Sequence, residues 1–117
     1  MLQLTPKSVI YVATAYVDCR KGIDGLIAVC RQNLNLEPFE GQIFLFYNRS
    51  RTTFKIISFD GQGFWLCMKR LSQGKFKYKQ IDSTNTYQQI CYRSLQILLN
   101  NGDPAAANLG DDWRKIS

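Results

Sequence analysis

The chain has 117 residues, a formal net charge of +6 and a sequence pI of about 9.3. This length suits one modest hydrophobic core, and an ordinary content of hydrophobic (45%) and charged (21%) residues excludes wholesale disorder. Histidine is absent, which excludes Ser-His and Cys-His nucleophile pairs, imidazole bases and histidine metal ligands.

The first third of the chain predicts a strand followed by a helix. Residues 8–17 are rich in β-branched and aromatic side chains, which is typical of a strand. From Cys19 to Leu34 the apolar residues recur at helical spacing, and Asp18 is placed to cap this helix.

Four short strands are predicted next, because runs of β-forming residues are separated by short loops rich in Asn, Asp and Gly. They cover residues 42–47, 52–59, 63–70 and 75–81. The second of them carries apolar side chains at both odd and even positions, so we expect it to be covered on both faces. Asp60-Gly61 predicts a hairpin turn between the second and third strands rather than a phosphate-binding loop.

An amphipathic helix is predicted over about Thr84–Asn100, with Ser83 or Thr84 as its cap. We therefore expect an α+β fold, a mostly antiparallel β-meander sheet with two amphipathic helices on one face, in the order β-α-ββββ-α. The domain is expected to span residues 1–104, and residues 105–117 are expected to form a loosely ordered tail.

The four cysteines (Cys19, Cys30, Cys67 and Cys91) include no C-x-x-C pair, which argues against a structural zinc site. No secretory signal or membrane-length apolar run is apparent. We therefore expect a cytoplasmic protein with reduced thiols and no membrane partner. Cys30 and Cys91 are expected on apolar helical faces, acting as small hydrophobes.

Basic residues are concentrated in one segment of the chain. Residues 49–79 contain eight Lys or Arg and a single acid, Asp60, whereas the remainder is close to neutral. Such a segment suits contacts with the phosphate backbone of DNA, although lysines that protect an exposed sheet edge give the same pattern. The predicted phosphate contacts are Arg49, Arg51, Lys55, Lys69, Arg70 and Lys75, with Arg20 and Lys21 in a second rank.

Intrinsic catalysis is not expected. The nine acidic residues fall mostly at caps, turns and the tail, and none shows the spacing of a metal site. No cofactor, no metal and no small-molecule substrate are therefore predicted.

Three stretches of the sequence carry a family resemblance. They are residues 17–26, residues 40–46 with the following Asn48-Arg49, and residues 55–66. Together they resemble TnpB, the accessory protein encoded by the second open reading frame of bacterial insertion sequence family sixty-six. Cys19 stands where that family usually has Met, and the tail after Asn101 does not align.

The resemblance implies a role in transposition, beside a larger transposase that carries the strand-transfer active site. Together with the basic segment, it predicts a non-catalytic accessory protein that contacts DNA, or a transposase–DNA complex, through the basic meander. The alternative is a protein-interaction subunit that binds the catalytic transposase of the same element without touching DNA. In that case Phe39, Phe64, Trp65 and the sheet edge are candidate anchors.

Overall fold

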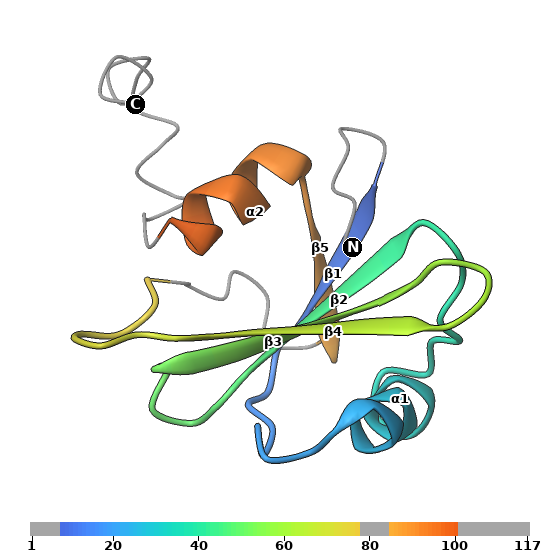
Figure 1. Ribbon diagram of the computed structural model, residues 1–117, viewed down its shortest axis with the longest axis horizontal. Coiled ribbons are helices and arrows are strands. Elements are labelled where there is room, and N and C mark those ends of the chain that lie inside the picture. The colour runs from blue at the N-terminus through green and yellow to red at the C-terminus, as the bar shows by residue number, and fades with distance from the viewer. Residues whose placement is uncertain (1–7, 78–84, 101–117) are drawn as a thin grey trace.

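Five strands form a single sheet in the order β4-β3-β2-β1-β5 in the computed structural model, which describes residues 8–77 and 85–100 (Figure 1). The elements are β1 (Val9–Ala13), α1 (Ile23–Gln32), β2 (Gln42–Tyr47), β3 (Thr53–Phe59), β4 (Phe64–Arg70), β5 (Tyr87–Ile90) and α2 (Tyr92–Leu99). This confirms the α+β class, the mostly antiparallel sheet and the order β-α-ββββ-α.

The sheet combines a crossover with a meander. β1 and β2 are parallel, so the chain crosses between them through α1. β2, β3 and β4 follow as antiparallel neighbours, and β5 returns to pair antiparallel with β1 on its other side. β4 and β5 are therefore the two edge strands.

The hairpin between β3 and β4 forms at the predicted place. Gly61 has a φ of +92°, a left-handed conformation that glycine adopts without strain. The carboxylate of Asp60 accepts bonds from the backbone N–H groups of Gln62 and Gly63, both at 2.9 Å, and from the indole N–H of Trp65 at 2.8 Å. One acidic side chain thus closes the turn.

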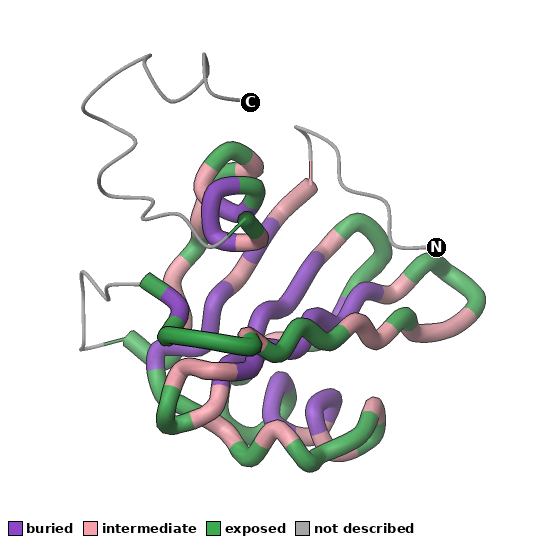
Figure 2. The backbone as a smooth tube through the Cα atoms, turned by 60° about the vertical axis from the view of Figure 1, so that its left-hand side comes forward, coloured by how far each residue is buried: buried purple, intermediate pink, exposed green. Residues whose placement is uncertain are grey.

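The expectation that both helices share one face of the sheet is wrong. In β2, Ile43 and Leu45 belong to the core beneath α2, whereas Phe44 and Phe46 belong to the core beneath α1. Since successive side chains point to opposite faces, a strand that is apolar throughout needs cover on both sides. Figure 1 shows α1 and α2 on opposite sides of the sheet, and Figure 2 shows the buried central strands between them.

The second half of the chain departs from its predicted elements. Residues 75–77 are not a strand, and the rest of the predicted strand over 75–81 lies outside the described residues, as do Ser83 and Thr84. Phe76 instead packs into the core, where the centroid of its ring lies 4.3 Å from the centroid of the Phe54 ring. The predicted helix is shorter, because residues 87–90 form β5 along the otherwise open edge of β1.

Cys91 separates β5 from α2 and caps the helix. Its sulfur accepts a bond from the backbone N–H of Ser94 at 3.4 Å, and the residue is exposed rather than part of an apolar helical face. Cys30, by contrast, is buried on the apolar face of α1, as expected.

The first predicted strand and helix are also shorter than expected. β1 ends at Ala13, and the chain then leaves the sheet, held by a bond from the Val17 backbone N–H to the Tyr47 carbonyl at 2.9 Å. α1 begins only at Ile23, after Gly22, and Asp18 does not cap it. The predicted tail over residues 105–117 lies outside the described residues.

Candidate nucleic-acid interface

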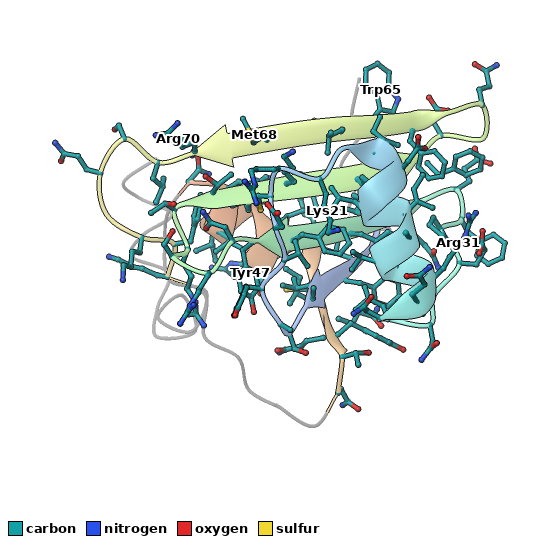
Figure 3. All side chains as sticks on the ribbon, turned by 90° about the horizontal axis from the view of Figure 1, so that it is seen from below. Lys21, Arg31, Tyr47, Trp65, Met68 and Arg70 are labelled. Carbon is teal, nitrogen blue, oxygen red and sulfur yellow. The ribbon has the colours of Figure 1, made fainter. Side chains whose placement is uncertain are left out.

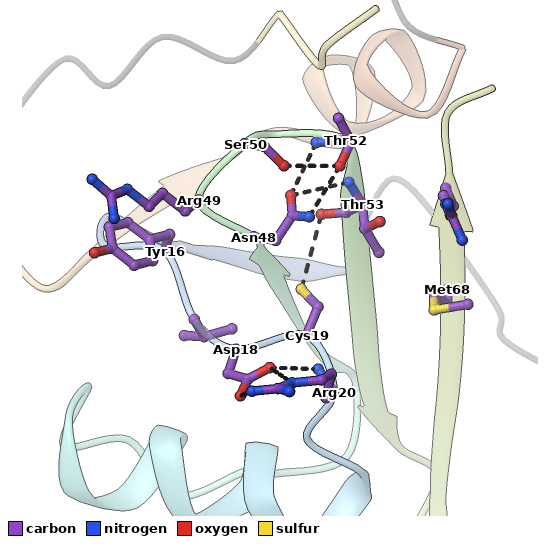
Figure 4. A pocket seen from close by; sticks show the side chains of 12 residues that line it. Tyr16, Asp18, Cys19, Arg20, Asn48, Arg49, Ser50, Thr52, Thr53 and Met68 are labelled. Atoms are coloured by element: carbon purple, nitrogen blue, oxygen red, sulfur yellow. Dashed lines mark hydrogen bonds and ion pairs between the residues drawn. The ribbon is translucent and has the colours of Figure 1, made fainter. Parts of the chain in front are cut away.

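Three separate segments meet around an open groove of about 860 Å³ at one end of the sheet (Figure 4). They are the chain that follows β1, the loop between β2 and β3, and the last residues of β4. The side chains that define it are Tyr16, Asp18, Arg20, Asn48, Arg49, Met68 and Arg70. We call it the arginine groove, since Arg20, Arg49 and Arg70 reach it from these three segments.

Arg49 and Tyr16 form one wall of the arginine groove. The guanidinium carbon of Arg49 lies 5.8 Å from the centroid of the Tyr16 ring, within the range of a cation–π contact. The Tyr16 side chain is still exposed, at 56%. This wall therefore offers a positive charge and an aromatic surface together.

Met68 and Arg70 form the opposite wall. Both alternate with Lys69 along β4 and so project to the face that α1 covers, as Leu66 does. Both are exposed, and Figure 3 shows them along the outer strand of the sheet.

The only acidic side chain in the arginine groove is Asp18, and it is paired. Its carboxylate accepts bonds from the Arg20 backbone N–H at 2.9 Å and from the Arg20 guanidinium at 2.9 and 3.0 Å. The bonds from Arg20 lower the pKa of Asp18 to about 2 and raise the pKa of Arg20 above its usual value. The pair is neutral overall, so Arg49 and Arg70 supply the net positive charge of the groove.

Asn48 fixes the loop that carries Arg49. Its side-chain oxygen accepts bonds from the backbone N–H groups of Thr52 at 2.9 Å and Thr53 at 3.1 Å, and its amide nitrogen donates to the Thr52 hydroxyl at 3.0 Å. The loop closes further through a bond from the Arg51 backbone N–H to the Asn48 carbonyl, with Arg51 at a positive φ of 59°. The conformation of Arg49 is thus set by an ordered turn.

The eight predicted contact residues fall into three groups in the structure. Arg20, Arg49 and Arg70 line the arginine groove. Lys21 and Lys75 are exposed but do not line it. The remaining three (Arg51, Lys55 and Lys69) are drawn away from it.

Lys55 is not part of an exposed basic surface. It is only 8% exposed, and its ammonium group donates a bond to the Lys21 carbonyl at 2.9 Å. Its place on β3, beneath the segment that leads into α1, explains this burial. A strand pattern shows which face a lysine takes but not that a distant loop will cover it.

Arg51 and Lys69 lie towards the face that α2 covers. The Arg51 guanidinium is 5.6 Å from the Tyr47 ring and lines a small pocket with Phe76 and Leu98. The ammonium group of Lys69 donates to the Leu99 carbonyl at the end of α2. Lys69 therefore bonds directly to the end of α2, whereas Arg51 lies beside the core under that helix.

The sequence did not identify Tyr16, Asn48 or Met68 as groove residues. An asparagine at the start of a short polar loop often caps the turn with its side chain. The role of Asn48 could therefore have been predicted from the sequence. The positions of Tyr16 and Met68 in the groove could not have been predicted, since they depend on segments that the sheet brings together.

Neither a metal centre nor a membrane-spanning helix is found in the part of the chain that the structure describes. Across residues 8–77 and 85–100, no three Cys, Asp or Glu side chains gather closely enough to bind a metal ion. Within the same ranges no helix has both the length and the apolar character needed to span a bilayer.

Comparison with known proteins places the chain beside one family. The family described as "IS66 Orf2 like protein" matches residues 8–108. Two proteins of Sinorhizobium fredii are similar: uncharacterized protein y4hO, 39% identical over 67 residues, and uncharacterized protein y4jC, 38% identical over 72 residues. These matches cover 57% and 62% of this chain, and 58% and 62% of the two relatives, so under two thirds of either relative is spanned. No solved structure matches.

Proposed function

Because this chain belongs to the IS66 Orf2-like family and is thereby associated with an insertion sequence, we propose that it acts as a non-catalytic accessory protein that contacts DNA in transposition. The contact surface is the arginine groove. The observation that carries the proposal is the meeting of Arg20, Arg49 and Arg70 around one open groove, whose single acid is already paired.

The chemistry of the arginine groove suits phosphate. A guanidinium group donates two parallel hydrogen bonds to phosphate oxygens, and its charge displaces a condensed counterion from DNA. Arg49 and Arg70 are available for such contacts, and the exposed ring of Tyr16 adds a surface for a sugar or a base. The partner in this proposal is DNA alone or DNA held by the larger transposase, which carries out strand transfer.

The basic residues are divided between the two faces of the sheet, so we expect DNA binding to depend only modestly on salt concentration. All six first-rank residues acting together would correspond to a log–log slope of roughly −5, at about −0.9 per phosphate contact. Arg49 and Arg70, the two groove arginines that no acid neutralises, correspond to a slope of about −2. The magnitude of the slope therefore distinguishes the arginine groove from a uniformly basic meander.

The test is a salt titration of binding, measured by fluorescence anisotropy on duplexes from the element ends and on random duplexes. We expect binding at low salt with a slope of about −2, and a slope close to zero for the double variant Arg49→Gln/Arg70→Gln. Each substitution should weaken binding about tenfold at low salt, since each removes a charge-assisted hydrogen bond.

The matched control is Arg93→Gln, which removes one charge from the exposed surface of α2 on the other side of the sheet. This variant should bind as the unmodified protein does, within about twofold. Absence of binding at low salt, or binding that salt does not affect, would overturn the proposal. Retention of the transposase after nuclease treatment, without any DNA shift, would favour the protein-interaction subunit instead.

A further inference from the structure

β4 presents an open backbone edge along its whole length. It is the outermost strand, and its seven residues pair with β3 without a bulge, from Phe59 opposite Phe64 to Thr53 opposite Arg70. Beyond this strand, the backbone N–H of Leu71 donates to Thr52 at 2.8 Å. Hydrogen-bonded and non-hydrogen-bonded pairs alternate, so the odd-numbered residues of β4 bond to β3.

The even-numbered residues therefore direct their backbone groups outward. These residues are Phe64, Leu66, Met68 and Arg70. Within residues 8–77 and 85–100, no segment pairs with that side of β4.

The middle of this edge lacks the usual protection against strand pairing. Edge strands are commonly guarded by charges, prolines, bulges or short length. Here the run Phe64–Met68 is uncharged and uninterrupted, and Trp65 and Met68 are 40% and 61% exposed. Figure 3 shows Trp65, Met68 and Arg70 along the outer strand. Such an edge is suited to accept a partner strand.

We propose that β4 pairs antiparallel with β4 of a second copy of this chain, centred on Cys67. This register is the one that pairs all seven residues. It places Leu66 opposite the partner's Met68, and Phe64 opposite the partner's Arg70, so that the outward backbone groups of the two copies meet. Cys67 then faces the partner's Cys67 in a non-hydrogen-bonded pair.

The distribution of charge along β4 selects this arrangement. The strand begins beside Asp60 and ends at Lys69 and Arg70, so its two ends carry opposite charges. Antiparallel pairing brings the basic end towards the partner's Asp60 and sets Arg70 against the aromatic ring of the partner's Phe64. A parallel arrangement would instead align the basic ends and place like charges side by side, which is destabilising.

Pairing of this kind creates one ten-stranded sheet with a two-fold axis perpendicular to it. A rotation about this axis does not turn the sheet over. The α1 helices of both copies therefore lie on the same side of the sheet, and so do both arginine grooves. The pairing itself rests on β4 alone and does not require the proposed function in DNA contact.

The first test measures the mass of the protein without DNA, by sedimentation over a concentration series. A dimer is expected for the unmodified chain and a monomer for Met68→Lys, which places a charge at the centre of the paired strands. Phe39→Lys is the matched control, because Phe39 is exposed to the same degree (62%) but lies outside β4. A monomer at all concentrations, or equal effects of the two substitutions, would overturn the proposal.

The second test uses the native thiols and needs no disruptive substitution. Opposed Cα atoms in a non-hydrogen-bonded pair lie about 4.5 Å apart, within the range that a disulfide spans. Oxidation with diamide, which accepts the two electrons and two protons released by two thiols, should therefore link the copies. The link should be lost in Cys67→Ser and kept in Cys91→Ser. Since Cys91 is the more exposed thiol, a cross-link that depends on Cys91 alone would contradict the pairing.

Discussion

Asn48 is the residue on which the geometry of the arginine groove most depends. Three hydrogen bonds from one side chain hold the loop after β2, and two of them satisfy the backbone N–H groups of Thr52 and Thr53. The loop has no apolar anchor of its own between Asn48 and Thr52, so these bonds decide where Arg49 points.

Replacement of Asn48 by alanine should lower the free energy of unfolding by about 1–2 kcal/mol, because it leaves partly buried N–H groups without an acceptor. It should also weaken DNA binding although no charge is removed. Urea unfolding and anisotropy measure the two effects. Ser50→Ala is the control, since the Ser50 hydroxyl makes one exposed bond to Thr52 and its loss should cost under about 0.5 kcal/mol. Equal losses for both variants would contradict the role given to Asn48.

The thiols of Cys91 and Cys30 should differ in reactivity. Hydrogen bonds from the Ser94 side chain and backbone lower the pKa of Cys91, whereas burial raises the pKa of Cys30 to about 12. At mildly alkaline pH, Cys91 therefore carries the larger thiolate fraction and should be alkylated first by iodoacetamide, as followed by mass spectrometry. In urea the two rates should converge. Faster native-state labelling of Cys30 would show that the α1 face opens readily.

At the scale of single elements, α2 is a short helix that depends on the sheet. It has only eight residues, which is too few for stability in isolation, and Leu95 and Leu98 anchor it over β1 and β2. Its final carbonyl groups are partly satisfied from outside the helix, where Lys69 donates to Leu99. α2 thus depends on packing and on one contact from β4.

Leu98→Ala should destabilise the protein by about 2–5 kcal/mol, the usual cost of removing a fully buried leucine side chain. Thermal unfolding monitored by circular dichroism measures this loss. Gln96→Ala, on the exposed side of the same helix, should be nearly neutral. A small effect of Leu98→Ala would mean that α2 contributes little to the core.

Elements formed by local interactions were predicted more accurately than those that depend on residues far away in the sequence. β2 was predicted with its bounds, and β3 and β4 to within one residue, because alternation and the Asp60-Gly61 turn are local signals. β5 was missed. Its four residues also fit a helical stripe, and only pairing with β1, far away in sequence, makes them a strand.

At the scale of the whole molecule, the sheet separates two hydrophobic cores. One contains Ile10 and Ile56 beneath α2, and the other contains Ile57 beneath α1. Ile10→Val and Ile57→Val should each cost about 0.5–1.5 kcal/mol. Since they lie on different strands and opposite faces, the double variant should be additive to within about 0.5 kcal/mol in urea unfolding. A larger coupling would mean that the two cores act as one.

The site was predictable only in part, for reasons of the same kind. The excess of basic residues over 49–79 was visible in the sequence, and it includes Arg49 and Arg70 of the arginine groove. The sequence did not show which of these Lys and Arg side chains share a surface, because their positions depend on the segments that cover each face of the sheet. That cover buries Lys55 under the chain leading into α1 and turns Arg51 and Lys69 towards α2.

Pairing of β5 with β1 sets the order in which the protein can be completed during synthesis. Ile10 is translated long before its strand neighbour Ile90 and before Leu95 and Leu98, which cover it. At about 5–20 residues per second, this cover follows Phe76 with a delay on the order of seconds. For that interval the nascent chain exposes one apolar face and a second open edge, so a segment that is translated late protects one that is translated early.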